Sequence, residues 1–156
     1  MKLTRYTDYA LRVLMHLAAR PDRLASIGEM ARVYRISHNH LMKVVQDLRT
    51  AGYLDAVRGR AGGVRLARPA SEIKVGEVVR HSEGGFDLVD CGSCLISPAC
   101  RLTGVLHEAL GAFMAVLDRY SLADLVEGRD AALRELFASI GLPQPGAAKM
   151  AGDRPT

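Results

Sequence analysis

Three cysteines are the residues of this sequence best suited to chemistry. They are the only cysteines among its 156 residues, and Cys91, Cys94 and Cys100 lie within a span of ten. Thiolates are soft ligands, and a C-x2-C-x5-C loop can fold three of them around one centre. We therefore predict a metal or iron–sulfur site here. The odd number of cysteines also argues against a disulfide scaffold.

A fourth ligand is needed, because three thiolates leave one position of a tetrahedral iron or zinc ion unfilled. Three candidates are present: Asp90 beside the first cysteine, His107 seven residues after the last one, and Asp8 in the first turn of an expected N-terminal helix. Each also has an ordinary explanation as a solvated residue or as a charge that favours a helix end. Sequence spacing alone does not choose between them.

Helical patterns in the first fifty residues predict a helix-turn-helix. Apolar residues with a helical period run from Tyr6 to Leu17. Ser26 is the predicted N-cap of a short second helix. Ser37 is the predicted N-cap of a third helix, which extends to Thr50. Two short helices separated by about three residues are typical of this DNA-binding motif.

A β-hairpin is expected to follow the helices. Residues 53–57 and 63–67 have the pattern of strands, joined by a glycine-rich turn. Arg58, Arg60 and Arg65 belong to this hairpin and could enter a minor groove or bind phosphates. A helix-turn-helix followed by a basic hairpin is a winged helix.

The third expected helix has a polar face suited to reading DNA. Its apolar residues Leu41, Val44, Val45 and Leu48 fall on one side. Side chains that can contact base edges or phosphates lie on or beside the opposite side: Asn39, His40, Lys43 and Gln46. His38, near the first turn of the helix, is a further candidate.

The charge distribution agrees with a DNA-binding first half. Residues 1–70 contain 13 Lys or Arg and 5 Asp or Glu, whereas residues 71–156 contain 8 and 12. A basic half indicates a polyanionic partner. No apolar run approaches the roughly 18 residues of a membrane span, and no signal-peptide core is present, so we expect a cytoplasmic protein without a membrane partner.

The second half predicts a long helix suited to packing against a second copy of the chain. Its apolar stripe covers residues 102–120; the alternative is that it packs on its own winged helix. The expected fold is therefore mainly α with a small β-wing. We predict a winged helix-turn-helix DNA-binding domain over residues 1–70, a cysteine loop and dimerisation helices over 71–135, and a disordered tail over 142–156.

Several motifs together resemble the IscR/NsrR family of winged-helix iron–sulfur regulators. The resemblance covers residues 1–135 and is carried by segments 3–12, 57–63, 75–79, 98–102 and 122–126. It is closest to the NsrR branch of nitric-oxide-sensing repressors, through Thr-Asp-Tyr at 7–9 and Ile-Ser-Pro-Ala-Cys at 96–100.

The resemblance implies a homodimer with crossed long helices, bound to a partly palindromic double-stranded DNA operator. It also implies an iron–sulfur cluster held by the three cysteines and by Asp8 of the partner subunit. IscR-type relatives use a His three residues after the last cysteine, where this chain has Thr103. Relatives usually place four or more residues between the first two cysteines, whereas this chain has two. Both [4Fe–4S] and [2Fe–2S] clusters therefore remain open.

The functional hypothesis is a transcriptional repressor controlled by a cluster that senses nitric oxide. One alternative is a regulator of the IscR kind that responds to iron–sulfur or iron status. Another is a structural DNA-binding module stabilised by zinc. An enzyme is not expected, because no Ser/His/Asp or paired-carboxylate arrangement stands out, and the five histidines fall mainly on the expected DNA face or on helix surfaces.

Overall fold

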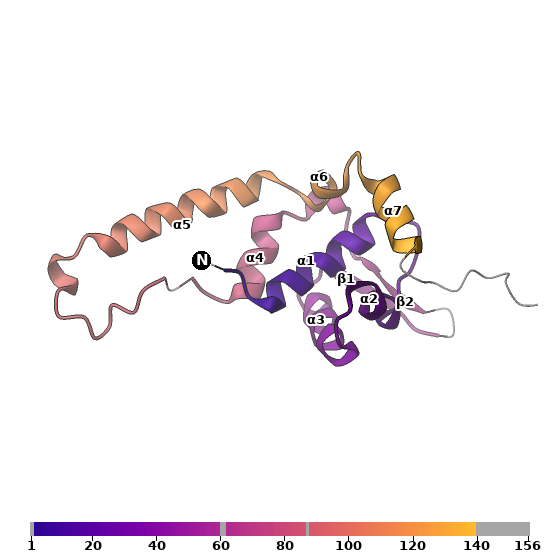
Figure 1. Ribbon diagram of the computed structural model, residues 1–156, viewed down its shortest axis with the longest axis horizontal. Coiled ribbons are helices and arrows are strands. Elements are labelled where there is room, and N and C mark those ends of the chain that lie inside the picture. The colour runs from indigo at the N-terminus through magenta and orange to yellow at the C-terminus, as the bar shows by residue number, and fades with distance from the viewer. Residues whose placement is uncertain (1, 60–61, 87, 140–156) are drawn as a thin grey trace, which may run out of the picture.

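The chain forms a rounded body from which one long helix and a loop extend as an arm (Figure 1). The computed structural model describes residues 2–59, 62–86 and 88–139. The predicted tail at 142–156 and the wing residue Arg60 lie outside these ranges. In the described part of the chain, no helix combines the length and the apolar character that a membrane crossing requires.

Helices form most of the structure. They are α1 (Arg5–Ala18), α2 (Ile27–Tyr34), α3 (His38–Thr50), α4 (Val75–Glu83), α5 (Leu102–Arg119), α6 (Leu122–Val126) and α7 (Asp130–Ser139), with short 3-10 turns η1 (Ala70–Glu72) and η2 (Ser97–Ala99). Strands β1 (Leu54–Val57) and β2 (Gly63–Leu66) pair antiparallel, with Leu54 opposite Leu66. The arrangement is mainly α with a small β-wing, as predicted.

The expected N-caps are present at the helix-turn-helix. The Ser26 hydroxyl accepts a hydrogen bond from the Glu29 amide at 3.0 Å, and the Ser37 hydroxyl accepts one from the His40 amide at 3.2 Å. Strand β1 begins one residue later than expected, because the Tyr53 amide donates to the carbonyl at the end of α3 instead of to the strand partner.

One core holds the body together. It draws buried side chains from α1, α2 and α3 and also from the segment after residue 70. Its fully buried members include Leu14, Met30, Leu41, Leu48, Ile73, Val78 and Leu122. Burial of each large apolar side chain contributes about 1.5–3 kcal/mol. The division of the chain at residue 70 stays a prediction.

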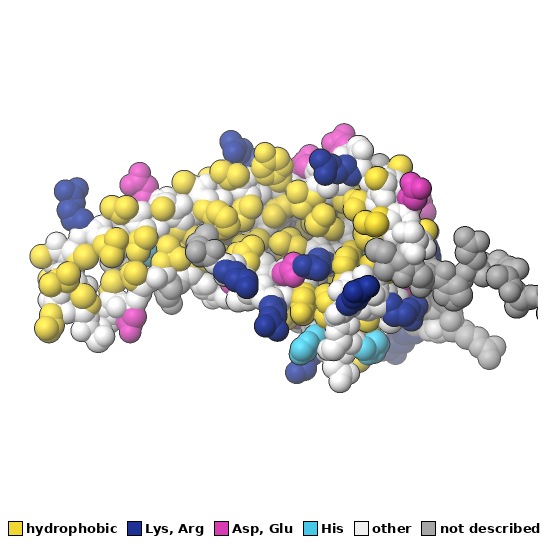
Figure 2. Space-filling view, in the orientation of Figure 1, with side chains coloured by type: hydrophobic (Ala, Val, Ile, Leu, Met, Phe, Trp, Pro, Cys, Tyr) yellow, Lys and Arg dark blue, Asp and Glu magenta, His cyan; other side chains and the backbone are white. Residues whose placement is uncertain are grey.

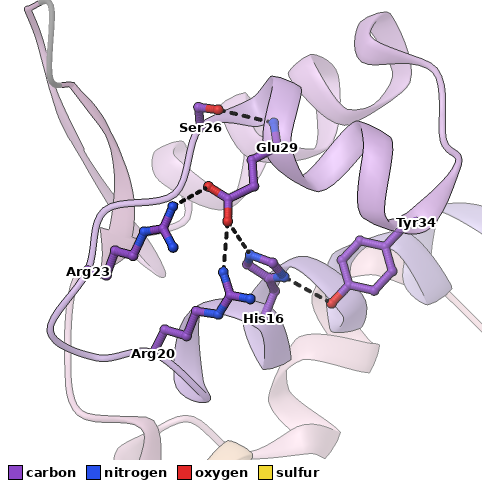
Figure 3. A network of polar contacts seen from close by, with 6 residues as sticks. All are labelled: His16, Arg20, Arg23, Ser26, Glu29 and Tyr34. Carbon is purple, nitrogen blue, oxygen red and sulfur yellow. Dashed lines mark hydrogen bonds and ion pairs between the residues drawn. The ribbon is translucent and has the colours of Figure 1, made fainter. Parts of the chain in front are cut away.

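A buried polar cluster joins α1 to α2 (Figure 3). The Glu29 carboxylate accepts hydrogen bonds from Arg20 at 2.7 Å and from Arg23 at 3.3 Å. The fully buried His16 lies beside them, with its Nδ1 3.4 Å from the Tyr34 hydroxyl. Burial, followed by the nearby charge of Arg20, lowers the pKa of His16 to about 4. The ring is therefore neutral at neutral pH, and its interior position differs from the expected place on a helix surface.

Helix α7 closes over this cluster, although sequence analysis did not predict it. Phe137 is 6% exposed, and its ring centroid lies 4.6 Å from that of His16. The Arg20 guanidinium lies 4.9 Å from the same Phe137 centroid, which is a cation–π distance. The C-terminal helix thereby completes the core of the N-terminal elements.

Candidate nucleic-acid interface and metal centre

Helix α3 presents the predicted polar face to solvent. Leu41 and Leu48 are fully buried, as expected for the opposite side. The residues predicted to contact DNA on this helix are all exposed: His38, Asn39, His40, Lys43 and Gln46. Histidine side chains gather at the lower edge of the body in Figure 2, where Figure 1 places α3. The structure thus provides the surface, and the role of each residue stays a prediction.

A hollow of about 710 Å³ lies between α3 and the wing. Lys43 and Gln46 line it from the helix, and Ala56 and Val64 line it from the strands. The lining also includes Arg49 and Met42, which sequence analysis did not select. Met42 is 47% exposed; its helical angle, on the side of α3 away from the buried leucines, would have been the signal.

The wing carries two described arginines of the predicted set. Arg58 is exposed. Arg65 lies 3.9 Å from Asp55, and both side chains are more than half exposed. A pair this exposed contributes little to stability, so both cations are accessible to phosphates.

The three cysteines lie on the loop between α4 and α5, at the outer part of the arm. All are free thiols; Cys94 is exposed, whereas Cys91 and Cys100 are partly buried. The Leu102 amide, at the start of α5, donates to the Cys100 sulfur at 3.4 Å. The Cys91 sulfur lies 3.2 Å from the Thr103 hydroxyl.

These thiols fit an iron–sulfur cluster by their chemistry. They are soft, free donors on an exposed loop, and a backbone N–H at a helix N-terminus points at one sulfur, which is the kind of hydrogen bond that tunes cluster sulfurs. Among the described residues of one chain, however, no group of three or more Cys, His, Asp or Glu side chains converges as a metal site. In the described part of the chain, the three cysteines therefore do not converge on one point, with or without a fourth donor.

The candidate fourth ligands lie in two different places. Asp90 and His107 line a hollow of about 520 Å³ together with Cys91. Asp8 lines another hollow, of about 430 Å³, where its carboxylate accepts a hydrogen bond from Arg12 at 2.8 Å. Among the residues that the structure describes, no cysteine lines the hollow at Asp8. The Asp8 side chain is 45% exposed and is therefore accessible to an approaching group.

The pattern that defines the Rrf2 family, described as iron-dependent transcriptional regulators, matches residues 3–128. The chain belongs to the Rrf2 family. It is a transcriptional regulator, and the winged helix described above is the part suited to DNA.

Similar proteins agree with this assignment. The HTH-type transcriptional regulator NsrR of Bacillus subtilis is 52% identical over 136 residues, which is 83% of this chain and 93% of that protein. NsrR of Shouchella clausii is 48% identical over 136 residues, covering 83% and 91%. The predicted resemblance to the IscR/NsrR family is confirmed.

Solved structures confirm the predicted fold class. T. potens IscR matches with a TM-score of 0.70 and 27% identity, over 85% of this chain and 90% of that one. CymR, the global cysteine regulator of B. subtilis, matches with a TM-score of 0.66 and 26% identity, over 80% and 95%. This Rrf2 protein therefore has the mainly α, winged-helix fold that its sequence predicts.

Proposed function

We propose that this Rrf2 protein is a homodimeric repressor whose binding to operator DNA is controlled by an iron–sulfur cluster that senses nitric oxide. The observation that carries the proposal is the set of three free thiols on an exposed loop, in a chain so similar to NsrR regulators. When bound, such a cluster supplies iron that reacts with nitric oxide. The residues of the chain hold the cluster and convert its state into DNA affinity.

We assign the ligands to Cys91, Cys94 and Cys100 of one chain and to Asp8 of the partner subunit. The assignment of Asp8 follows the Thr-Asp-Tyr motif at residues 7–9. It is supported by the exposure of the Asp8 side chain, which is 45% exposed and lines a surface hollow. Because a carboxylate is a hard ligand for a soft centre, its bond is the weakest point of the set.

The second copy of the chain is expected along α5. Of the residues of this helix, all of which the structure describes, only Met114 is buried. Leu102, Val105 and Val116 are 53%, 59% and 44% exposed. Hydrophobic side chains cover much of the arm in Figure 2. A large exposed apolar surface marks an interaction site, and a crossed α5 from an identical chain would cover it.

The winged helices of the dimer would then bind two half-sites. Helix α3 enters the major groove, where Asn39 and Gln46 can contact base edges. Lys43 and the wing residues Arg58, Arg60 and Arg65 neutralise phosphates. If the link between Asp8 and the cysteine loop of the other subunit is lost, the distance between the two α3 helices is no longer fixed. Operator affinity would then fall.

Operator affinity of anaerobic protein, measured before and after nitric oxide, tests the proposal. We expect affinity to fall together with the visible absorbance of the cluster. Unchanged affinity contradicts the proposal. A response to cluster loading but not to nitric oxide would indicate a sensor of iron–sulfur supply, and colourless protein containing zinc would indicate the structural module.

A further inference from the structure

The end of α4 nearest the cysteine loop makes a polar contact with the recognition helix α3. The His81 Nε2 lies 2.7 Å from the Oδ2 of Asp47 on α3. The Tyr6 hydroxyl of α1 donates to the same oxygen at 2.6 Å. One carboxylate oxygen therefore joins three helices, and the DNA contacts proposed above do not involve it.

Asp47 accepts both hydrogen bonds as a carboxylate. Burial alone would raise the pKa of Asp47, but the hydrogen bonds from Tyr6 and His81 outweigh burial and lower it. An ionised carboxylate can only accept, so the His81 ring donates through Nε2–H. The Tyr53 ring lies edge-on to the His81 ring, with centroids 5.8 Å apart, and helps to hold its orientation.

The position of Asp47 on α3 places this contact close to the side chains proposed to bind DNA. At about 100° per residue, Asp47 lies only about 40° around the helix axis from Lys43. It therefore sits at the flank of the DNA-facing side, between that side and the buried apolar side. Holding Asp47 therefore restrains the flank of α3 that adjoins the side chains facing DNA.

The other contacts of α4 join it to the arm. Arg80 forms a two-pronged ion pair with Asp118 of α5, and the Val75 amide donates to the Tyr120 carbonyl just after α5, at 2.9 Å. Gly76 faces Asp118 so closely that a Cβ would overlap the carboxylate. Helices α4 and α5 are thus fastened to each other, and they carry the two ends of the cysteine loop.

The last residue of α4 also binds the start of α1. The Glu83 carboxylate accepts hydrogen bonds from the Thr4 amide at 2.8 Å and from the hydroxyls of Thr4 and Thr7. Thr7 immediately precedes Asp8. The final turn of α4 therefore contacts the helix of a proposed ligand through Glu83 and the recognition helix through His81.

We propose that the His81–Asp47 hydrogen bond transmits the state of the cysteine loop to α3, so that Asp47 and His81 are positioning residues for operator binding. This inference rests on the proposed function. Ordering of the loop fixes the final turn of α4, which carries His81. His81 then holds Asp47 and the orientation of α3. Without the contact, α3 keeps its core packing but no longer responds to the loop.

The test compares operator affinity of cluster-loaded and cluster-free full-length protein, prepared anaerobically. We expect His81→Ala and Asp47→Ala each to reduce the ratio of the two dissociation constants by on the order of tenfold, as for loss of one charge-assisted hydrogen bond. The double variant should lose no more than either single variant, because both remove the same contact. Iron content and visible absorbance should stay as in the wild type.

Two further variants separate this role from a general structural one. His81→Gln keeps an N–H donor and should retain most of the wild-type ratio. Ser82→Ala, on the same helix, removes a hydroxyl that donates only within α4, to the Val78 carbonyl at 2.8 Å, and should leave the ratio unchanged. A wild-type ratio in His81→Ala, or an equal loss of affinity in both states, overturns this inference alone. If the wild type binds the operator equally well with and without the cluster, the proposed function is overturned as well.

Discussion

The buried cluster around His16 and the cysteine loop differ in how far their polar and thiol side chains are buried and paired. In the cluster, His16 is fully buried, and Glu29, 4% exposed, has both carboxylate oxygens bound by arginines (Figure 3). On the loop, Cys94 is exposed and its neighbour Leu95 is 97% exposed. The first region is completed by its own chain. In the second, thiols and apolar side chains are exposed in the described part of one chain.

Removal of Glu29 should have the largest effect on stability. Glu29→Ala leaves the charge of Arg20 buried without its carboxylate, and we expect the free energy of unfolding to fall by about 3–5 kcal/mol. Leu95→Ala is the matched change in the loop and should alter it by less than about 0.5 kcal/mol. Urea denaturation followed by circular dichroism measures both. Equal losses would contradict the contrast between the two regions.

Acid should weaken the body through His16. The pKa of His16 is about 4 in the folded chain and about 6.5 when unfolded, so the unfolded state binds more protons between these values. Stability is therefore full above pH 6.5 and declines towards pH 4, by at most about 3 kcal/mol. Asp47 and Glu83 have lowered pKa values, so their contributions are lost only at still lower pH.

Urea denaturation at intervals between pH 7 and pH 4.5 measures this decline. His16→Gln should flatten the pH dependence in this window, whatever its effect on stability at pH 7. A decline as steep in His16→Gln as in the wild type would rule out His16 as its source. Arm substitutions such as Leu95→Ala should leave the slope unchanged.

Asp8→Ala should weaken cluster binding without lowering the free energy of unfolding of the body. We expect the cluster to be lost at least about tenfold faster, since even residues that only support metal ligands change metal affinity 10–100-fold. Anaerobic iron and sulfide quantification with visible absorbance provides the measurement. Asp90→Ala is the control and should retain the cluster. Full retention in Asp8→Ala would reject Asp8 as a ligand.

A mixed dimer can show which subunit supplies Asp8. One chain carries Asp8→Ala and the other carries Cys91→Ala. If the carboxylate comes from the partner subunit, one of the two sites remains intact and half of the cluster is retained. If each chain supplies its own, both sites are damaged and the mixed dimer should hold almost none.

Lys43→Ala should have the smallest effect in this series. Loss of one phosphate contact should weaken DNA binding similarly for all sequences and reduce the slope of log affinity against log salt by about 1. Fluorescence anisotropy at several salt concentrations measures the slope. Asn39→Ala is the contrasting variant, expected to cost about 1–3 kcal/mol and to relax sequence preference. A sequence-dependent loss in Lys43→Ala would indicate that Lys43 contacts a base.

Local patterns predicted the elements of the DNA-binding surface. Ser26 and Ser37 cap their helices through bonds spanning three residues, and the exposed face of α3 follows from helix geometry and its buried leucines. These features depend on neighbours in sequence, so a single chain reveals them. The cysteine spacing likewise indicated soft-metal chemistry, although it could not show where a fourth donor lies.

Features formed by distant residues could not be read in the same way. Helix α7 packs on the body chiefly through Leu133 and Phe137. Two apolar residues one turn apart are too few to predict a helix that packs on the core. His81 and Asp47 are 34 residues apart, and each looks like an ordinary surface residue in its own helix. Such contacts are set by the packing of α4 against α1 and α5, which local periodicity does not specify.

The burial of Phe137 also imposes an order on biosynthesis. A ribosome delivers the chain from its N-terminus, so Cys100 leaves the exit tunnel well before Phe137 arrives to cover His16. The thiol-bearing loop is therefore exposed to solvent while the core of the DNA-binding elements still lacks α7. The arm can therefore emerge and begin to fold on a nascent chain whose DNA-binding end has yet to finish folding.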